Sequence, residues 1–197
     1  MIFVETLITL LVIMDPIGSV PIFLSLTARA PQARTKAALQ ATLTAGGVIA
    51  VFAIFGEYLL RVLDVSLPAL QVSGGLLLVL VALELLHPRS VEDELDHGMN
   101  VALVPLGTPL LAGPGAIAAI MVRMRDTDGA AGVAEVLAAL AVTVLVVFLV
   151  LGLAAKISAV VKPNGIALVS RLVGLLLAAI AVQLVAGGID TWVRSGV

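Results

Sequence analysis

Long apolar stretches separated by short polar connections dominate the 197-residue chain. A span needs about 20 mostly apolar residues to cross a bilayer, and six stretches reach that length: residues 2–26, 39–60, 67–86, 101–122, 133–155 and 166–189. Leu, Val, Ala and Ile follow one another in them without the two-residue alternation of a barrel strand. Because backbone groups in lipid must be hydrogen-bonded within the segment, the pattern predicts six membrane-spanning helices.

The composition supports a membrane protein and excludes other classes. Hydrophobic residues make up 61% of the chain and charged residues 12%, and the mean hydropathy is +1.20. A soluble fold needs more polar residues than this to cover its core. With 11 Lys and Arg against 13 Asp and Glu, the chain has no basic excess for nucleic acid. The expected surroundings are the lipid bilayer, around a single membrane domain that covers residues 1–197.

The two halves of the chain carry matching features. GLLLVLVALEL at 75–85 aligns with GLLLAAIAVQL at 174–184, which lies 99 residues later. A polar break at Asp15-Pro16 in the first stretch has a counterpart 98 residues later, at Gly113-Pro114 in the fourth. Both offsets are close to half the chain length, which indicates a duplicated unit of three spans.

An odd number of spans in each unit has a geometric consequence. The second unit, about residues 99–197, must enter the membrane from the side opposite to the first, about residues 1–98. The predicted fold is therefore an all-α polytopic membrane protein whose six transmembrane helices form two inverted three-helix repeats. The first helix of each repeat is expected to be broken. Inverted repeats suit transport by alternating access, although some channels share them.

The breaks contain residues that a continuous helix does not tolerate. Asp followed by Pro is a helix-start signal, so we expect half-helices over 2–14 and 16–27, with Asp15 as the N-cap and Pro16 as the first helical residue. In the fourth stretch we expect a half-helix to begin at Pro114 and to leave the N–H groups of Gly115 and Ala116 unpaired.

The two breaks together suggest a site for a zwitterion near the bilayer midplane. A helix N-terminus at the second break suits a carboxylate, and the acid at the first break suits an ammonium group. Alternatives are a merely satisfied cap at Asp15, a packing kink at the second break, and hydroxyl groups that only bond nearby backbone. The candidate substrate-binding residues are Asp15, Pro16, Gly18, Ser19, Thr108, Gly113, Pro114 and Gly115.

Other charged positions are weaker candidates. Asp15 and Glu84 are the candidates for ion coupling, and the coupling ion is left open between a proton, sodium and none; snorkelling to the interface is the alternative for Glu84. Glu57 precedes Arg61 by four residues, the preferred direction for a helical ion pair. We expect no other cofactor, no metal site and, without a hydrolase or phosphate-loop motif, no enzymatic activity.

The distribution of Lys and Arg predicts an orientation. Seven of them lie near the connections after the first, third and fifth stretches, against four on the opposite side. The positive-inside rule then places both termini on the non-cytoplasmic side of a multi-pass protein of the cell (inner) membrane. The sequence permits a homo-oligomer without requiring one.

Four segments resemble the MarC family of integral membrane proteins, also called the neutral amino acid transporter family, within the lysine-exporter superfamily. They are DPIGSVPIFLSLT at 15–27, VSGGLLLVLVALELL at 72–86, VPLGTPLLAGPGAI at 104–117 and SRLVGLLLAAIAVQLVAGGI at 170–189. The resemblance covers essentially the whole chain. It implies six spans and, as for a few members, transport of small neutral amino acids such as glycine or alanine.

The family's paired motifs fall on particular residues of this chain. They are Asp15, Pro16, Gly18, Pro21, Pro109, Gly113 and Pro114. The chain departs from the family pattern at Ser19, where Asn is usual, and at Ser170, where an acid often stands. If the family's Asn and acid contact the substrate or the coupling ion, these departures weaken the inference of the same substrate and ion for this chain. The leading hypothesis is a secondary transporter of small neutral amino acids or similar metabolites, and the alternative is an ion or small-solute channel of the same architecture.

Overall fold

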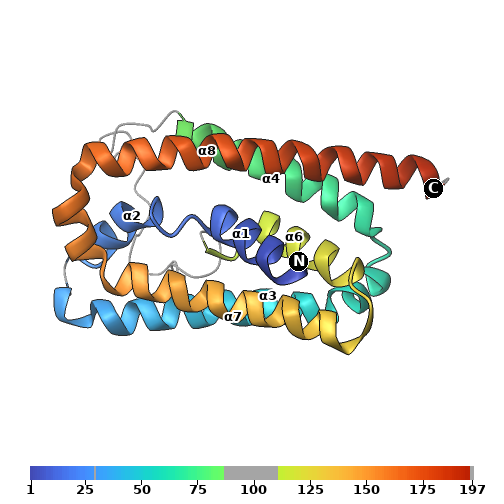
Figure 1. Ribbon diagram of the computed structural model, residues 1–197, viewed down its shortest axis with the longest axis horizontal. Coiled ribbons are helices and arrows are strands. Elements are labelled where there is room, and N and C mark those ends of the chain that lie inside the picture. Colours follow the sequence, from blue (N-terminus) through green and yellow to red (C-terminus); the bar gives the residue numbers. More distant parts are fainter. Residues whose placement is uncertain (29, 87–110, 196–197) are drawn as a thin grey trace.

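The computed structural model describes residues 1–28, 30–86 and 111–195, without the side chains of 162–164 and 195. In these ranges the chain is helical apart from short turns and forms no strand (Figure 1). The elements are α1 (Ile2–Met14), α2 (Ser19–Leu26), the 3-10 turn η1 (Pro31–Ala33), α3 (Arg34–Val62), α4 (Leu67–Leu86), α6 (Pro114–Arg125), α7 (Gly129–Gly152) and α8 (Ala154–Ser195).

Four segments are long and apolar enough to cross a membrane by themselves: Pro31–Val62, Leu67–Leu86, Gly129–Gly152 and Gly165–Arg194. A fifth candidate span is the pair of α1 and α2, which meet at an angle of 51° across a short break. The predicted fourth span falls partly outside the described residues, and α6 is its described second half. The protein is thus an all-helical multi-pass membrane protein.

The connection between the predicted fifth and sixth spans differs from expectation. The fifth span ends at Gly152 rather than 155, and α8 begins at Ala154, so that the expected loop is helical. Figure 1 shows the first part of α8 crossing one end of the bundle before the helix runs alongside α4. Helix α8 continues through Pro163 and Gly165, residues that favoured a loop in the sequence. A helix satisfies the backbone groups of this segment next to lipid better than an open loop would.

Glycines let α4 and α8 approach each other closely. A Cβ atom added at Gly75 would lie 2.9 Å from the carbonyl oxygen of Ala181, and one added at Gly174 would lie 3.2 Å from that of Ala82. Small residues at such contacts allow close backbone packing, which drives helix association in membranes. The α4–α8 seam, defined by these four residues, is one of two interfaces on which the bundle rests.

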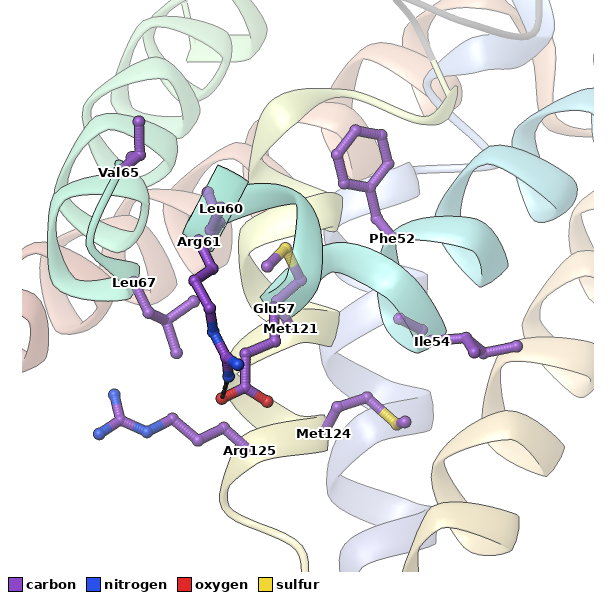
Figure 2. A pocket seen from close by; sticks show the side chains of 11 residues that line it. Phe52, Ile54, Glu57, Leu60, Arg61, Val65, Leu67, Met121, Met124 and Arg125 are labelled. Atoms are coloured by element: carbon purple, nitrogen blue, oxygen red, sulfur yellow. Dashed lines mark ion pairs between the residues drawn. The ribbon is translucent and has the colours of Figure 1, made fainter. Parts of the chain in front are cut away.

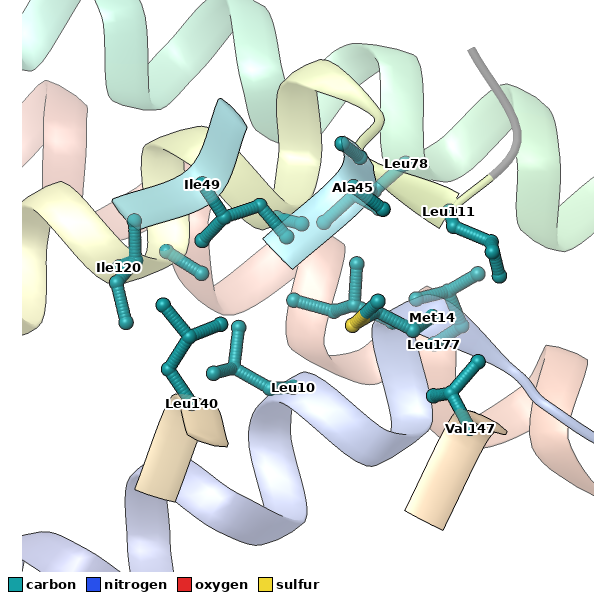
Figure 3. Close-up of a cluster of buried hydrophobic side chains, with 14 of the residues drawn as sticks. Leu10, Met14, Ala45, Ile49, Leu78, Leu111, Ile120, Leu140, Val147 and Leu177 are labelled. Carbon is teal, nitrogen blue, oxygen red and sulfur yellow. The ribbon is translucent and has the colours of Figure 1, made fainter. Parts of the chain in front are cut away.

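The other interface surrounds α1. This helix packs against α7, α3 packs against both α7 and α6, and α6 also contacts α1 and α4. Buried side chains of these helices and of α8 form the cluster in Figure 3, which includes Leu10 and Met14 of α1, Ile120 of α6, Leu140 and Val147 of α7, and Leu177 of α8. The inner ends of α1 and α6 therefore lie in a packed apolar interior.

Candidate functional site

The first break is a three-residue turn between α1 and α2. Pro16 has no N–H group to continue α1, and the chain turns through Pro16, Ile17 and Gly18 before α2 begins at Ser19. The Asp15 carbonyl oxygen accepts two hydrogen bonds from Ser19, one from its N–H at 3.0 Å and one from its hydroxyl at 2.9 Å. Ser19 thereby ties the start of α2 to the end of α1.

The predicted capping role of Asp15 was wrong. Asp15 is the C-cap of α1 rather than the N-cap of the next helix, and Gly18 is the N-cap of α2. Its backbone is left-handed, with φ 35° and ψ 70°, a conformation that Asp and Asn tolerate better than most residues. Pro16 lies in the turn, so the half-helix expected over 16–27 is shorter and spans Ser19–Leu26.

The Asp15 carboxylate has one satisfied oxygen and one that is free. Oδ1 accepts a hydrogen bond from the Gly18 N–H at 3.0 Å. Oδ2 is buried and has no hydrogen-bond partner among the described residues, and the residue as a whole is 8% exposed. A Cβ atom at Gly18 would collide with this carboxylate, so the glycine makes room for it. A buried anionic oxygen without a donor is costly, and an ammonium group, a proton or a metal cation would satisfy it.

The second break agrees more closely with the prediction. Helix α6 begins at Pro114, after Gly113 in an extended conformation, with φ −64° and ψ 161°. The Ala116 N–H, expected to be unpaired, instead donates to the Gly113 carbonyl at 3.0 Å. Gly115 is packed so tightly that an added Cβ atom would collide with the Leu78 side chain. The N-terminus of α6 is therefore held against α4, with its positive dipole end toward the protein interior.

The structure places the other candidates at different positions. Asp15, Gly18 and Ser19 form one hydrogen-bonded group, whereas Thr108 and Pro109 lie outside the described residues. Glu84 is exposed near the end of α4. The two breaks are connected through apolar contacts, because their neighbours Met14 and Leu111 belong to the same buried cluster (Figure 3).

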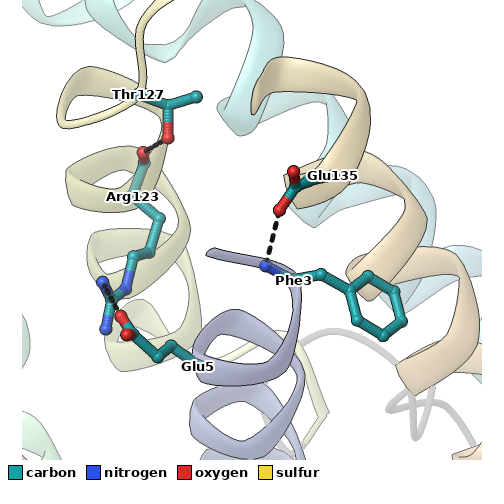
Figure 4. A network of polar contacts seen from close by, with 5 residues as sticks. All are labelled: Phe3, Glu5, Arg123, Thr127 and Glu135. Carbon is teal, nitrogen blue, oxygen red and sulfur yellow. Dashed lines mark hydrogen bonds and ion pairs between the residues drawn. The ribbon is translucent and has the colours of Figure 1, made fainter. Parts of the chain in front are cut away.

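A polar network that the sequence analysis did not identify joins the outer ends of α1 and α6 (Figure 4). The Arg123 guanidinium donates to Glu5 Oε2 at 3.0 Å, with the two side chains 34% and 50% exposed. On α7, Glu135 Oε2 accepts a hydrogen bond from the Phe3 N–H at 3.1 Å. An acid in the first turn of one helix and a base in the last turn of the other also suit the helix dipoles, which was the only sequence signal for this pair.

The predicted Glu57–Arg61 ion pair is confirmed, with its charged atoms 3.8 Å apart and both side chains mostly exposed. It borders a cavity of about 380 Å³ between the ends of α3, α4 and α6. The cavity is lined in part by Met121, Met124 and Arg125 of α6 and lies apart from the break at Asp15.

Known proteins resemble this chain over nearly its full length. A UPF0056 membrane protein of Methanocaldococcus jannaschii is 35% identical over 188 residues, covering 90% of each chain. A UPF0056 membrane protein of Aquifex aeolicus is 34% identical over 98% of this chain and 94% of its own. The UPF0056 inner membrane protein YhgN of Escherichia coli is 29% identical over 97% of this chain and 98% of its own. None of the solved structures matches the chain.

The family comparison agrees with the sequence motifs and with the helical architecture. The model of the MarC family integral membrane proteins matches residues 1–193, a range that includes both breaks and the α4–α8 seam. The chain therefore belongs to the MarC family of integral membrane proteins.

Proposed function

We propose that the protein is a secondary transporter that moves small neutral amino acids, or similar small metabolites, across the membrane by alternating access. The observation that carries the proposal is the buried Oδ2 oxygen of Asp15, which has no partner in the described part of the chain and lies at a break within a membrane span. Ionisable groups at such depth usually serve substrates or ions. The ammonium group of an amino acid substrate would bind this oxygen, and the carboxylate of the substrate would face the N-terminus of α6.

Alternating access on this proposal uses two inverted repeats, and the α4–α8 seam supports them. Gly75 approaches Ala181, and Gly174 approaches Ala82. Each residue of the first contact has its counterpart in the second at a sequence distance of 99. A two-fold axis in the membrane plane that passes through the middle of the seam would exchange one contact for the other.

The packing of the remaining helices supports the same axis. Exchange of the repeats would turn the α2–α7 contact into the contact between α3 and α6, and both contacts are present. Inverted repeats let two halves exchange conformations and so open the site to either side.

The proposal includes location and coupling. The relative in Escherichia coli is named as an inner membrane protein, which supports a location in the inner membrane. The Lys and Arg distribution supports an orientation with both termini on the non-cytoplasmic side. Asp15 would also bind the coupling proton or sodium ion when no ammonium group occupies it. Glu84, which is exposed, is the weaker coupling candidate.

Counterflow in proteoliposomes tests the transporter proposal. Vesicles loaded with unlabelled alanine or glycine are diluted into a trace of the labelled amino acid. We expect labelled substrate to accumulate transiently above its equilibrium level and the initial rate to saturate with concentration, because a carrier binds substrate in each cycle. Flux that rises linearly without counterflow would show a channel instead, and absence of flux for every small neutral amino acid would reject the substrate class.

The Glu5–Arg123 ion pair is predicted to hold the outer ends of the two broken helices together. Since the chain has no natural Cys, Ser19→Cys supplies a single thiol at the break. In that background, Glu5→Gln should raise the rate of labelling by a membrane-impermeant thiol reagent roughly threefold, as expected for loss of a half-exposed ion pair. The exchange of both charges, Glu5→Arg with Arg123→Glu, should restore the original rate. Equal labelling in all three proteins would contradict the prediction.

A further inference from the structure

The cavity between the ends of α3, α4 and α6 lies where a headgroup of the bilayer would meet the protein. Arg61 is in the last turn of α3, which ends at Val62, and Arg125 is the last residue of α6. Both helices end at the side of the bundle where α4 begins (Figure 1). Since the apolar spans end there, these two side chains lie near the depth of lipid phosphates.

The charged groups of the cavity gather at one end, and the rest of its lining is mostly apolar. Figure 2 shows the Arg61 side chain reaching the carboxylate of Glu57, and the Arg125 side chain beside this pair with its guanidinium extending away from the other two. Glu57 and Arg61 are 3.8 Å apart, longer than a charge-assisted hydrogen bond of about 2.8 Å. The guanidinium of Arg61 is therefore not fully occupied by Glu57.

The charge balance and the exposed surface favour a lipid over a soluble solute. Two guanidinium groups and one carboxylate give this end a net charge of one positive unit. Ile54, Glu57 and Arg61 follow one another at helical spacing along one face of α3, and Ile54 is 56% exposed. The neighbouring Phe55 and Tyr58 are also exposed. The cavity thus adjoins a helix face that is apolar up to its last two turns, as a lipid-facing surface is.

We propose that this cavity binds the phosphate of an anionic phospholipid, with Arg61 and Arg125 as its donors and the apolar lining against the glycerol and the first part of the acyl chains. Planar guanidinium groups bind phosphate oxygens in pairs of hydrogen bonds. A headgroup with one net negative charge, such as phosphatidylglycerol, matches the charge of the site, and a zwitterionic headgroup does not.

Native mass spectrometry of the detergent-purified protein tests the site, with phosphatidylglycerol and phosphatidylcholine added as probes. We expect the natural chain to retain phosphatidylglycerol in preference to phosphatidylcholine. The double variant Arg61→Gln, Arg125→Gln should lose this preference, with about tenfold weaker retention from the loss of two charge-assisted contacts. Replacement of both residues by Lys should keep the preference for phosphatidylglycerol, because the positive charge is kept, but with weaker retention, because Lys cannot form the paired hydrogen bonds of a guanidinium group.

Arg194→Gln is the matched control, since Arg194 also pairs with an acid four residues earlier on an exposed helix face, with Asp190 at 3.0 Å, and does not line the cavity. It should retain phosphatidylglycerol as the natural chain does. Equal retention by the double Gln variant and the natural chain would overturn the proposal. If inorganic phosphate or glycerol phosphate stabilised the protein as much as phosphatidylglycerol does, the site would bind a soluble anion. That result would also overturn the proposal. Neither outcome depends on whether amino acids are transported.

Discussion

Asp15→Asn is expected to abolish most transport while leaving the protein folded. Asn keeps a side-chain oxygen that can accept the Gly18 N–H and tolerates the left-handed backbone at this position. It removes the negative charge, so the buried oxygen no longer offers an ionic partner to an ammonium group or a coupling ion. Loss of one charge of a buried ionic contact costs about 3 kcal/mol, which corresponds to roughly a hundredfold lower uptake at substrate concentrations below saturation.

The thermal stability of the same variant should not fall together with its uptake. A buried carboxylate oxygen without a donor destabilises the fold, and functional residues often do so. Asp15→Asn should therefore unfold at the same temperature as the natural chain or at a slightly higher one, as measured by circular dichroism in detergent. Low uptake combined with a clearly lower unfolding temperature would mean that Asp15 acts in folding rather than in binding.

Asp64→Asn is the matched control for this experiment. Asp64 is the other residue besides Asp15 that has a positive φ without being glycine in the described chain, with φ 55°, and it lies exposed in the turn between α3 and α4. The substitution therefore makes the same chemical change on a similar backbone outside the break. Uptake should stay near the natural level; an equal loss in both variants would remove the special role of Asp15.

Gly75→Ala is expected to destabilise the protein through the α4–α8 seam. The new methyl group would lie 2.9 Å from the Ala181 carbonyl oxygen and 2.7 Å from a Val185 methyl group, closer than packed atoms allow. Overpacking of this kind costs about 1–3 kcal/mol. Gly174→Ala should behave alike because its Cβ atom would meet Leu85 at 2.9 Å and the Ala82 carbonyl at 3.2 Å. Thermal unfolding in detergent measures both effects.

A helical glycine without neighbours provides the contrast. A Cβ atom at Gly47 in α3 would meet nothing within 4 Å, so Gly47→Ala should leave stability unchanged or raise it by up to about 1 kcal/mol through helix propensity. If Gly75→Ala were as stable as Gly47→Ala, the two helices would not be held at the distance seen here, and the seam would lose its role in the inverted-repeat proposal.

The sequence predicted those features that depend on local chemistry. Apolar runs marked the spans, and Pro114 marked the start of α6 because a proline suits the first position of a helix. The same reasoning failed at Asp15, since an acid before a proline can cap the helix that follows or end the helix that precedes it. The chain takes the second course, and a turn separates the two half-helices.

Features that depend on contacts between distant segments were beyond sequence reasoning. The Glu5–Arg123 pair joins residues 118 positions apart, and neither residue has a local partner that marks it. The cavity at Arg61 and Arg125 arises only because α3 and α6 end side by side. The helical start of α8 was missed because lysines between two apolar stretches are typical of a loop. A helix at the membrane surface can carry lysine equally well.

The left-handed backbone at Asp15 limits which residues evolution can place there. Glu would keep the negative charge, but its longer side chain is poorly suited both to this conformation and to the short bond with the Gly18 N–H. Asn and Gly fit the backbone and lack the charge. Among the genetically encoded residues, Asp alone combines both properties, so a chain that needs the acid has no conservative substitution at this position. If the transporter proposal holds, relatives without the acid should carry a different solute.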